Sequence, residues 1–183
     1  MKKYLIKCFS LILLASPLIT SCGDESEEVV GPIVFITYVY YVLTPNAGGD
    51  AIILSFNDPD GEGGNAPTIT GGTLQSNTTY TGQIVLGTPD EDNTPEIIVE
   101  DVEHQFFYAA SGANISVQYA DMDADGNPIG LATTLTTTDA SSGNLTITLR
   151  HNLDKAGIGV ADGDISNAGG DTDMEVTFDI NIQ

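Results

Sequence analysis

The sequence has little positive charge and no tryptophan. Its 183 residues include five lysines and arginines against 26 aspartates and glutamates. Such an excess of negative charge repels nucleic-acid phosphates, so nucleic-acid binding is excluded, whereas divalent cations and basic partners are attracted. The absence of tryptophan argues against a carbohydrate-binding or glycosidase cleft, because such clefts usually carry aromatic platforms.

Long apolar runs are also absent, apart from one at the N-terminus. Residues 5–19 follow a basic start and form a run of about fifteen residues, short of the roughly twenty that a membrane-spanning helix needs. The run leads into Leu18-Ile19-Thr20-Ser21-Cys22, in which small residues precede a cysteine, as in a bacterial lipobox. We therefore expect residues 1–21 to be a lipoprotein signal peptide and Cys22 to be lipidated, which would anchor the chain to a membrane. Secretion without a lipid is the alternative.

An acidic segment separates this cysteine from the rest of the chain. Residues 22–31 are too polar to pack and are interpreted as the lipidated cysteine and an acidic tether, before a single domain at 32–183. The acidic cluster resembles the surface-export signal of Bacteroidota lipoproteins, which implies a cell-surface location at the outer membrane. A periplasmic linker is the alternative. After signal cleavage, Arg150 and Lys155 are the only basic residues.

The sequence contains no recognisable catalytic motif. Signal cleavage leaves Cys22 as the only cysteine, so no disulfide can form and the one thiol is expected to carry lipid. A Gly-x-Ser-x-Gly motif is absent, and carboxylates are so numerous that no pair stands out as catalytic. We therefore expect the protein not to be an enzyme.

Short β-branched and aromatic stretches separated by turn residues recur along the domain. Apolar and polar residues alternate in 145–150 and 174–182, which is the period of a strand with one buried face. No stretch has a convincing helical period, and the acidic insert at 88–103 is interpreted as a mobile loop with a short edge strand. The sequence therefore predicts an all-β fold, an antiparallel β-sandwich of immunoglobulin-like or Greek-key type. Further strands are expected at 33–43, 51–56, 68–70, 79–86, 104–109, 115–119 and 131–137.

Several motifs together resemble a family of small acidic lipoproteins from flavobacteria and other Bacteroidota. They are the lipobox, Asp58-Pro59-Asp60-Gly61, Glu103-His104-Gln105-Phe106-Phe107, Leu149-Arg150-His151 and Asp164-Ile165-Ser166-Asn167-Ala168-Gly169-Gly170. Members are sometimes labelled type 1 periplasmic-binding-fold proteins, although short strands without alternating helices favour a sandwich instead. They tend to accompany TonB-dependent outer-membrane receptors, so the resemblance implies an accessory lipoprotein for uptake.

One acidic turn has the spacing that opens a calcium-binding loop. Asp121, Asp123 and Asp125 alternate before a glycine, which allows their carboxylates to converge on one hard cation. The closing glutamate of an EF-hand is absent, so calcium would need ligands from elsewhere, and an ion-free acidic turn is the alternative. Two further partial ligand sets are Asp58, Asp60 and Glu62, and Asp162, Asp164, Asp171 and Asp173.

The chain has two histidines, His104 and His151, each beside an expected strand. If they met, two imidazoles with a carboxylate such as Glu100 or Glu103 would suit zinc or copper, and two imidazoles alone could ligate haem iron. They are 47 positions apart and lack the spacing of a zinc motif, so ordinary hydrogen-bonding roles are the alternative. We take His104, His151 and Glu103 as the candidate transition-metal site.

Together these expectations favour a binding protein. We expect a lipid-anchored outer-membrane module that is accessory to a TonB-dependent receptor in the uptake of a metal ion or metal complex. The alternative is a structural or interaction lipoprotein whose acidic loops bind calcium or a basic partner.

Overall fold

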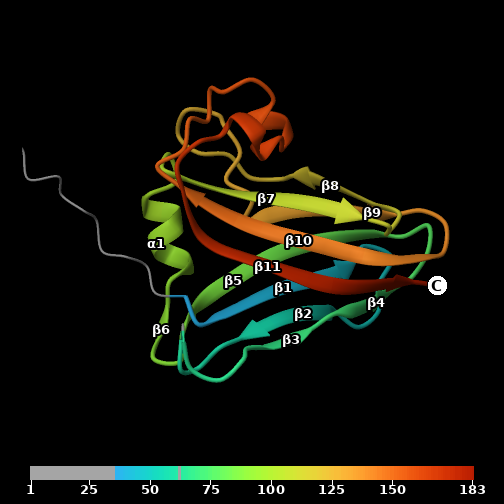
Figure 1. The fold of residues 1–183 in the computed structure, drawn as a ribbon. Helices are drawn as coiled ribbons and strands as arrows, with labels where there is room; N and C mark the ends of the chain where they lie inside the picture. The colour runs from blue at the N-terminus through green and yellow to red at the C-terminus, as the bar shows by residue number, and fades with distance from the viewer. Residues whose placement is uncertain (1–35, 62) are drawn as a thin grey trace, which may run out of the picture. The chain divides into compact units, whose positions relative to one another are not determined.

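Strands with one buried and one exposed face form two packed sheets in the computed structural model, which describes residues 36–61 and 63–183 (Figure 1). The predicted all-β fold, an antiparallel β-sandwich, is confirmed. The expected signal peptide, the lipidated Cys22 and the acidic tether lie outside the described residues, as does Glu62 of one partial calcium set.

The larger sheet contains seven strands in the order β3-β2-β1-β5-β9-β8, and β6 pairs with β5. Its central strands, β1 and β5, are rich in β-branched and aromatic residues, and nearly every second side chain is buried. This pattern is typical of a sheet that packs on one face. The bounds are Tyr38–Pro45 for β1, Ile52–Asn57 for β2, Thr68–Thr70 for β3, Thr79–Thr88 for β5, Glu91–Asp92 for β6, Ile115–Tyr119 for β8 and Ala132–Thr137 for β9.

The smaller sheet contains four strands in the order β4-β11-β10-β7, with a parallel pair only between β4 and β11. The chain leaves this sheet after β7, forms β8 and β9 in the larger sheet, and returns as β10 beside β7. Such crossings between sheets are typical of Greek-key and immunoglobulin-like sandwiches. The bounds are Gly72–Leu74 for β4, His104–Ser111 for β7, Ser141–His151 for β10 and Asp171–Ile182 for β11.

Apolar side chains from both sheets fill the space between them. Met174, Val176 and Phe178 of β11 are buried, and the residues between them face outward, as the sequence alternation predicts. Tyr41 is also fully buried, and its hydroxyl lies 2.6 Å from the hydroxyl of Thr133, so this buried polar atom is paired. The shared core holds the strand ends of the two sheets in fixed positions.

The acidic insert at 88–103 contains a short edge strand, β6, as expected, but it also contains a helix that the sequence did not predict, α1 at Thr94–Val99. A proline occupies the first turn of α1, where its missing N–H costs nothing, and an acidic side chain favours the helix N-terminus. Ile97 is fully buried, whereas Ile98 and Val99 are exposed, so one apolar side chain anchors the helix. Three consecutive apolar residues carry no alternation that would have distinguished strand from helix.

The loop between β10 and β11 contains two short 3-10 helices, η1 at Val160–Asp162 and η2 at Ile165–Asn167. Val160 and Ala168 of this loop form a small second core with Phe107 of β7, which fastens the loop to the smaller sheet. In Figure 1 this loop, α1 and the start of β7 lie at the same end of the sandwich. That end carries both histidines.

Candidate metal centre

His104 and His151 lie side by side at this end of the smaller sheet. His104 is the first residue of β7 and His151 is the last residue of β10, and antiparallel pairing makes them register partners. Their rings stack, with centroids 4.5 Å apart and planes 5° from parallel. The fold therefore brings together two candidate ligands that are far apart in the sequence.

A β-bulge brings a carboxylate to the same place. The register between β10 and β11 shifts between Leu149 and Arg150, so Asp173 is an additional residue on β11. One Asp173 oxygen lies 3.6 Å from Nε2 of His104, and the other lies 3.9 Å from Nδ1 of His151. The sequence predicts Asp173 only as a member of a partial calcium set. It does not predict the contact of Asp173 with the histidines, because no residue pattern indicates the bulge.

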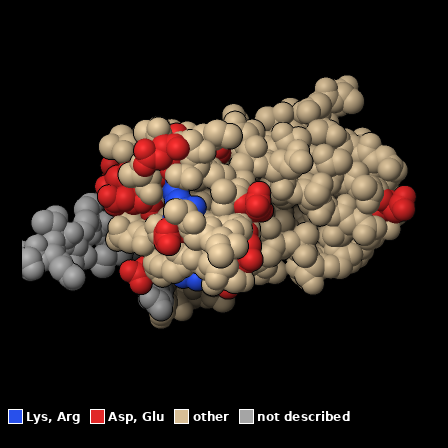
Figure 2. Space-filling model, turned by 90° about the horizontal axis from the view of Figure 1, so that it is seen from above, with Lys and Arg blue, Asp and Glu red and all other residues tan. Residues whose placement is uncertain are grey.

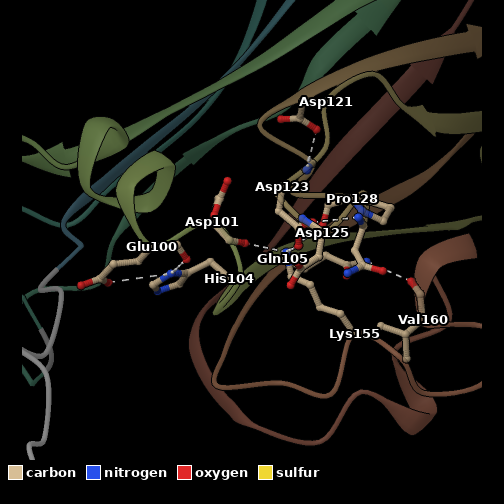
Figure 3. A network of polar contacts seen from close by, with 12 residues as sticks. Glu100, Asp101, His104, Gln105, Asp121, Asp123, Asp125, Pro128, Lys155 and Val160 are labelled. Carbon is tan, nitrogen blue, oxygen red and sulfur yellow. Dashed lines mark hydrogen bonds and ion pairs between the residues drawn. The ribbon is translucent and has the colours of Figure 1, made fainter.

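Two glutamates face the other nitrogens of the two rings. Glu100, which follows α1, places its backbone oxygen 3.1 Å and a carboxylate oxygen 3.9 Å from Nδ1 of His104 (Figure 3). The carboxylate of Glu103 lies 3.5 Å from Nε2 of His151, so this predicted residue contacts one of the histidines. Glu100, His104 and His151 each offer a ligand atom within 4.8 Å of the others. The cluster therefore contains both glutamates that the sequence suggested.

His104 is fully buried, so water screens it only weakly from the charged and polar groups around it. Among the described residues, its Nε2 and the facing oxygen of Asp173 have no hydrogen-bond partner. Burial acts to lower the pKa of His104, but the Asp173 carboxylate and the backbone carbonyl of Glu100 act in the opposite direction, and the pKa is raised overall. The acidic and carbonyl groups around this ring therefore outweigh the effect of its burial on the pKa.

The donor set of the cluster suits a divalent transition metal. Imidazole nitrogens and carboxylate oxygens are ligands of zinc, copper and similar borderline dications. Haem, the other predicted option, requires two imidazoles that point at the iron from opposite faces of the porphyrin. The rings of His104 and His151 lie face to face instead, an arrangement that does not provide two axial ligands to one haem.

A lysine occupies the acidic turn that the sequence predicts to bind calcium. The Lys155 ammonium donates to a carboxylate oxygen of Asp123 at 2.9 Å and to the backbone oxygens of Asp101 at 2.6 Å and Pro128 at 3.0 Å (Figure 3). The other oxygen of Asp123 accepts two backbone N–H groups of its own turn. One cationic side chain thus joins the loop after α1, the acidic turn and the loop after β10.

The other two aspartates of that turn do not form an open cation-binding position together with Asp123. Both carboxylate oxygens of Asp121 accept backbone N–H groups, from Gly130 and Ala132, at 2.8 Å. Asp125 is exposed. Calcium binding by Asp121, Asp123 and Asp125 stays a prediction, and the contacts of Lys155 do not favour it.

The remaining partial calcium sets also have carboxylates that are engaged locally. Asp60 accepts hydrogen bonds from the backbone and the side chain of Asn65. Asp164 caps η2, because its side chain accepts the N–H of Ser166. Asp173, the last member of the third set, belongs to the histidine cluster.

Acidic side chains gather around this end of the sandwich. On the face shown in Figure 2 most of them lie toward the end that carries α1 and the loop after β10. A field of that sign raises the local concentration of cations. The surroundings of the cluster therefore favour the approach of a dication.

Comparison of this chain with known proteins found no match: no protein family, no curated protein and no solved structure. Within the part of the chain that the structure describes, no helix is both long and apolar enough to cross a membrane. Function is therefore inferred from the chemistry of the cluster.

Proposed function

We propose that the domain binds a divalent transition-metal ion through His104 and His151. The observation that supports this most strongly is a fully buried imidazole, His104, stacked on a second imidazole and surrounded by carboxylates. Histidines with ordinary structural roles are normally satisfied by hydrogen bonds, as buried polar groups are in general. The donor types gathered here, two imidazoles and several carboxylates, are those that transition metals bind, which supports the proposal.

Two buried polar atoms of the cluster are in a position to interact with a dication. Nε2 of His104 and the facing oxygen of Asp173 are buried without hydrogen-bond partners among the described residues. An unsatisfied buried polar group costs about 1–3 kcal/mol. A metal ion bonded to such atoms would remove that cost and offset the negative charge around them, so metal binding is coupled to the stability of the fold.

We propose a biological role that combines this site with the lipidation and export signals expected at the N-terminus. Cys22 would carry lipid and hold the domain at the outer membrane, on the cell surface or in the periplasm. The resemblance to lipoproteins that accompany TonB-dependent receptors supports a role in the uptake of a metal ion or metal complex. In this role the domain would capture the ion in its acidic field and present it to the receptor.

Thermal melts of the full chain test the proposal, first in chelator and then with zinc, copper, calcium or haem added separately. A ligand at about 100 times its dissociation constant adds about 2.7 kcal/mol of stability, which corresponds to a rise of about 5–11 °C in a domain of this size. We expect such a rise with zinc or copper, and none with calcium or haem.

Two substitutions make the melts specific to the cluster. His151→Ala should abolish the rise with zinc, because it removes a ligand that is partly exposed and contributes little to the core. Asp139→Asn, at an exposed position near the opposite end of β10, removes one charge far from the cluster and should retain the full rise. No rise with any transition metal, or the same rise in His151→Ala as in the wild type, would contradict the proposal.

A further inference from the structure

We propose that a hollow between β5, α1 and the acidic turn is a docking site for a protein partner that presents an apolar side chain beside a lysine or arginine. The hollow has a volume of about 430 Å³, and no residue of the histidine cluster lines it. Its lining is mostly apolar, with one carboxylate, and includes Val85, Ile98, Asp121, Ile129, Leu131 and Ala132. The proposal is independent of metal binding, so either one can fail without the other.

The hollow exists because β5 is longer than β9, its partner in the larger sheet. The last register pair between the two strands is Gln83 with Ala132, and β5 continues to Thr88. Farther along β5, α1 takes the place of β9, and the hydroxyl of Thr94 accepts the N–H of Leu86 at 3.1 Å (Figure 1). Side chains do not fill the space between the start of β9 and α1, and this space is the hollow.

Apolar side chains in and beside the hollow are exposed. Ile98 of α1 lines the hollow and is 56% exposed. Tyr40 of β1 is the register partner of Val85 and so lies on the same face of the sheet, where it is 37% exposed. Its ring stacks on that of Tyr38, with centroids 5.1 Å apart. Exposed apolar patches of this kind mark interaction sites, because burying them against a partner is favourable.

The sheet beside the hollow is neutral. Strands β1, β2, β3, β5, β8 and β9 contain no charged residue, although the chain as a whole is strongly acidic. In the smaller sheet, by contrast, β11 alone carries Asp171, Asp173, Glu175 and Asp179. A partner can therefore approach this face without placing its apolar groups against buried or crowded charges.

Asp121 gives the hollow its preference for positive charge. One carboxylate oxygen accepts the N–H of Gly130 and the other accepts the N–H of Ala132, both at 2.8 Å, which fixes the carboxylate in place (Figure 3). A carboxylate oxygen can accept more than one hydrogen bond. Each oxygen can therefore accept a further, charge-assisted hydrogen bond from an ammonium or guanidinium group.

Among the described residues, no basic side chain is placed to neutralise this carboxylate. Lys155 is bound to Asp123, and Arg150 lies on β10 in the other sheet. On the opposite side of the hollow, β6 pairs with the end of β5 and adds two exposed carboxylates. A second copy of this chain, joined through the same face, would bring another Asp121 to the interface. The charges therefore favour a basic partner over self-association.

Peptide titrations of the full chain, followed in amide NMR spectra, test the proposal. The probes are acetyl-Lys-Phe-Lys-amide and two matched peptides in which glutamine or glutamate replaces both lysines. The lysine peptide should shift the signals of Val85, Ile98 and Ala132. It should bind about 3- to 10-fold more tightly than the glutamine peptide, because a hydrogen bond between charged groups is stronger than a neutral one. The glutamate peptide should not bind measurably.

Three substitutions make the titration specific to the hollow. Ala132→Leu should weaken binding of the lysine peptide about 10-fold, because the larger side chain occupies the hollow. Ile98→Ala should weaken it about 3-fold, because it removes apolar contact area. Val99→Ala, on the same helix but outside the lining of the hollow, should bind as the wild type does. Unshifted signals in the rest of each spectrum show that the variant is folded.

Four results would overturn the proposal. They are no binding of the lysine peptide, equal binding of the lysine and glutamine peptides, binding that Ala132→Leu leaves unchanged, and a dimer in sedimentation that Ala132→Leu abolishes. The third would assign the binding to scattered surface carboxylates, and the fourth would assign the hollow to a second copy of this chain. None of them bears on zinc binding by the histidines, so the proposed function would be unaffected.

Discussion

Replacing Lys155 with methionine should destabilise the domain by about 3 kcal/mol, because removing one partner of a buried ion pair leaves the other charge uncompensated. Lys155 is 7% exposed and donates to three oxygens. Methionine keeps most of the aliphatic stem, so the loss falls on the ammonium group. Because Asp123 keeps two backbone N–H donors, the loss belongs at the lower end of the usual range of about 3–5 kcal/mol.

Urea unfolding followed by circular dichroism measures this loss as a lower midpoint at an unchanged slope. The thermal midpoint should fall by about 6–12 °C, since 1 kcal/mol corresponds to about 2–4 °C in a domain of this size. In the double variant with Asp123→Asn, the loss should be smaller than the sum of the two single losses, because the partners are coupled. A loss below about 1 kcal/mol, which is typical of an exposed ion pair, would refute the reasoning.

The same ion pair gives the stability a dependence on pH. Burial acts to raise the pKa of Asp123, but Lys155 and backbone N–H groups act in the opposite direction, and the pKa is lowered overall. A carboxylate with a lowered folded-state pKa stabilises the fold above its unfolded value of about 3.9, and that stability is lost as the pH falls through the folded value. The difference in stability between the wild type and Asp123→Asn should therefore shrink below about pH 4, which acid unfolding curves can measure.

Three further changes test other parts of the structure. Asp123→Asn should lower the melting temperature equally in calcium and in chelator, because Lys155 already occupies its carboxylate; a loss confined to calcium would support a calcium site instead. Gly170→Ala should cost about 1–3 kcal/mol in urea unfolding and weaken zinc binding, because its φ is +67° and a Cβ would overlap a carbonyl oxygen of β10. Gly169→Ala, with similar φ and open space, should leave zinc affinity unchanged. Ile97→Ala should cost about 2–5 kcal/mol, whereas Val99→Ala in the same helix should stay within about 0.5 kcal/mol, as measured by the same unfolding assay.

The strands could be predicted from the sequence because alternation is a local property. In β11 each second residue from Met174 onward is apolar, and these residues are buried. The short helix α1 could not be predicted, because Ile97 alone is buried and a single anchor gives no period. Local pattern thus determined the strands, whereas a single tertiary contact determined the helix.

The candidate site could be predicted only in part, because its residues meet through strand register. The sequence predicts His104 and His151 as metal ligands by residue type, but their contact depends on which residues of β7 and β10 pair. Asp173 reaches them because of one additional residue on β11, which changes no local composition. The sequence gives no sign of the role of Lys155, because its partners come from two other loops. Side chains that assemble over such sequence separations leave no spacing to recognise.

The measurement that tests the central claim most directly is a calorimetric titration of zinc into the full chain and into the double variant His104→Ala, His151→Ala. The wild-type chain should bind one ion that the double variant does not bind, and any ions held by cysteine or by scattered surface carboxylates should appear equally in both. Identical titrations of the two proteins would contradict the account.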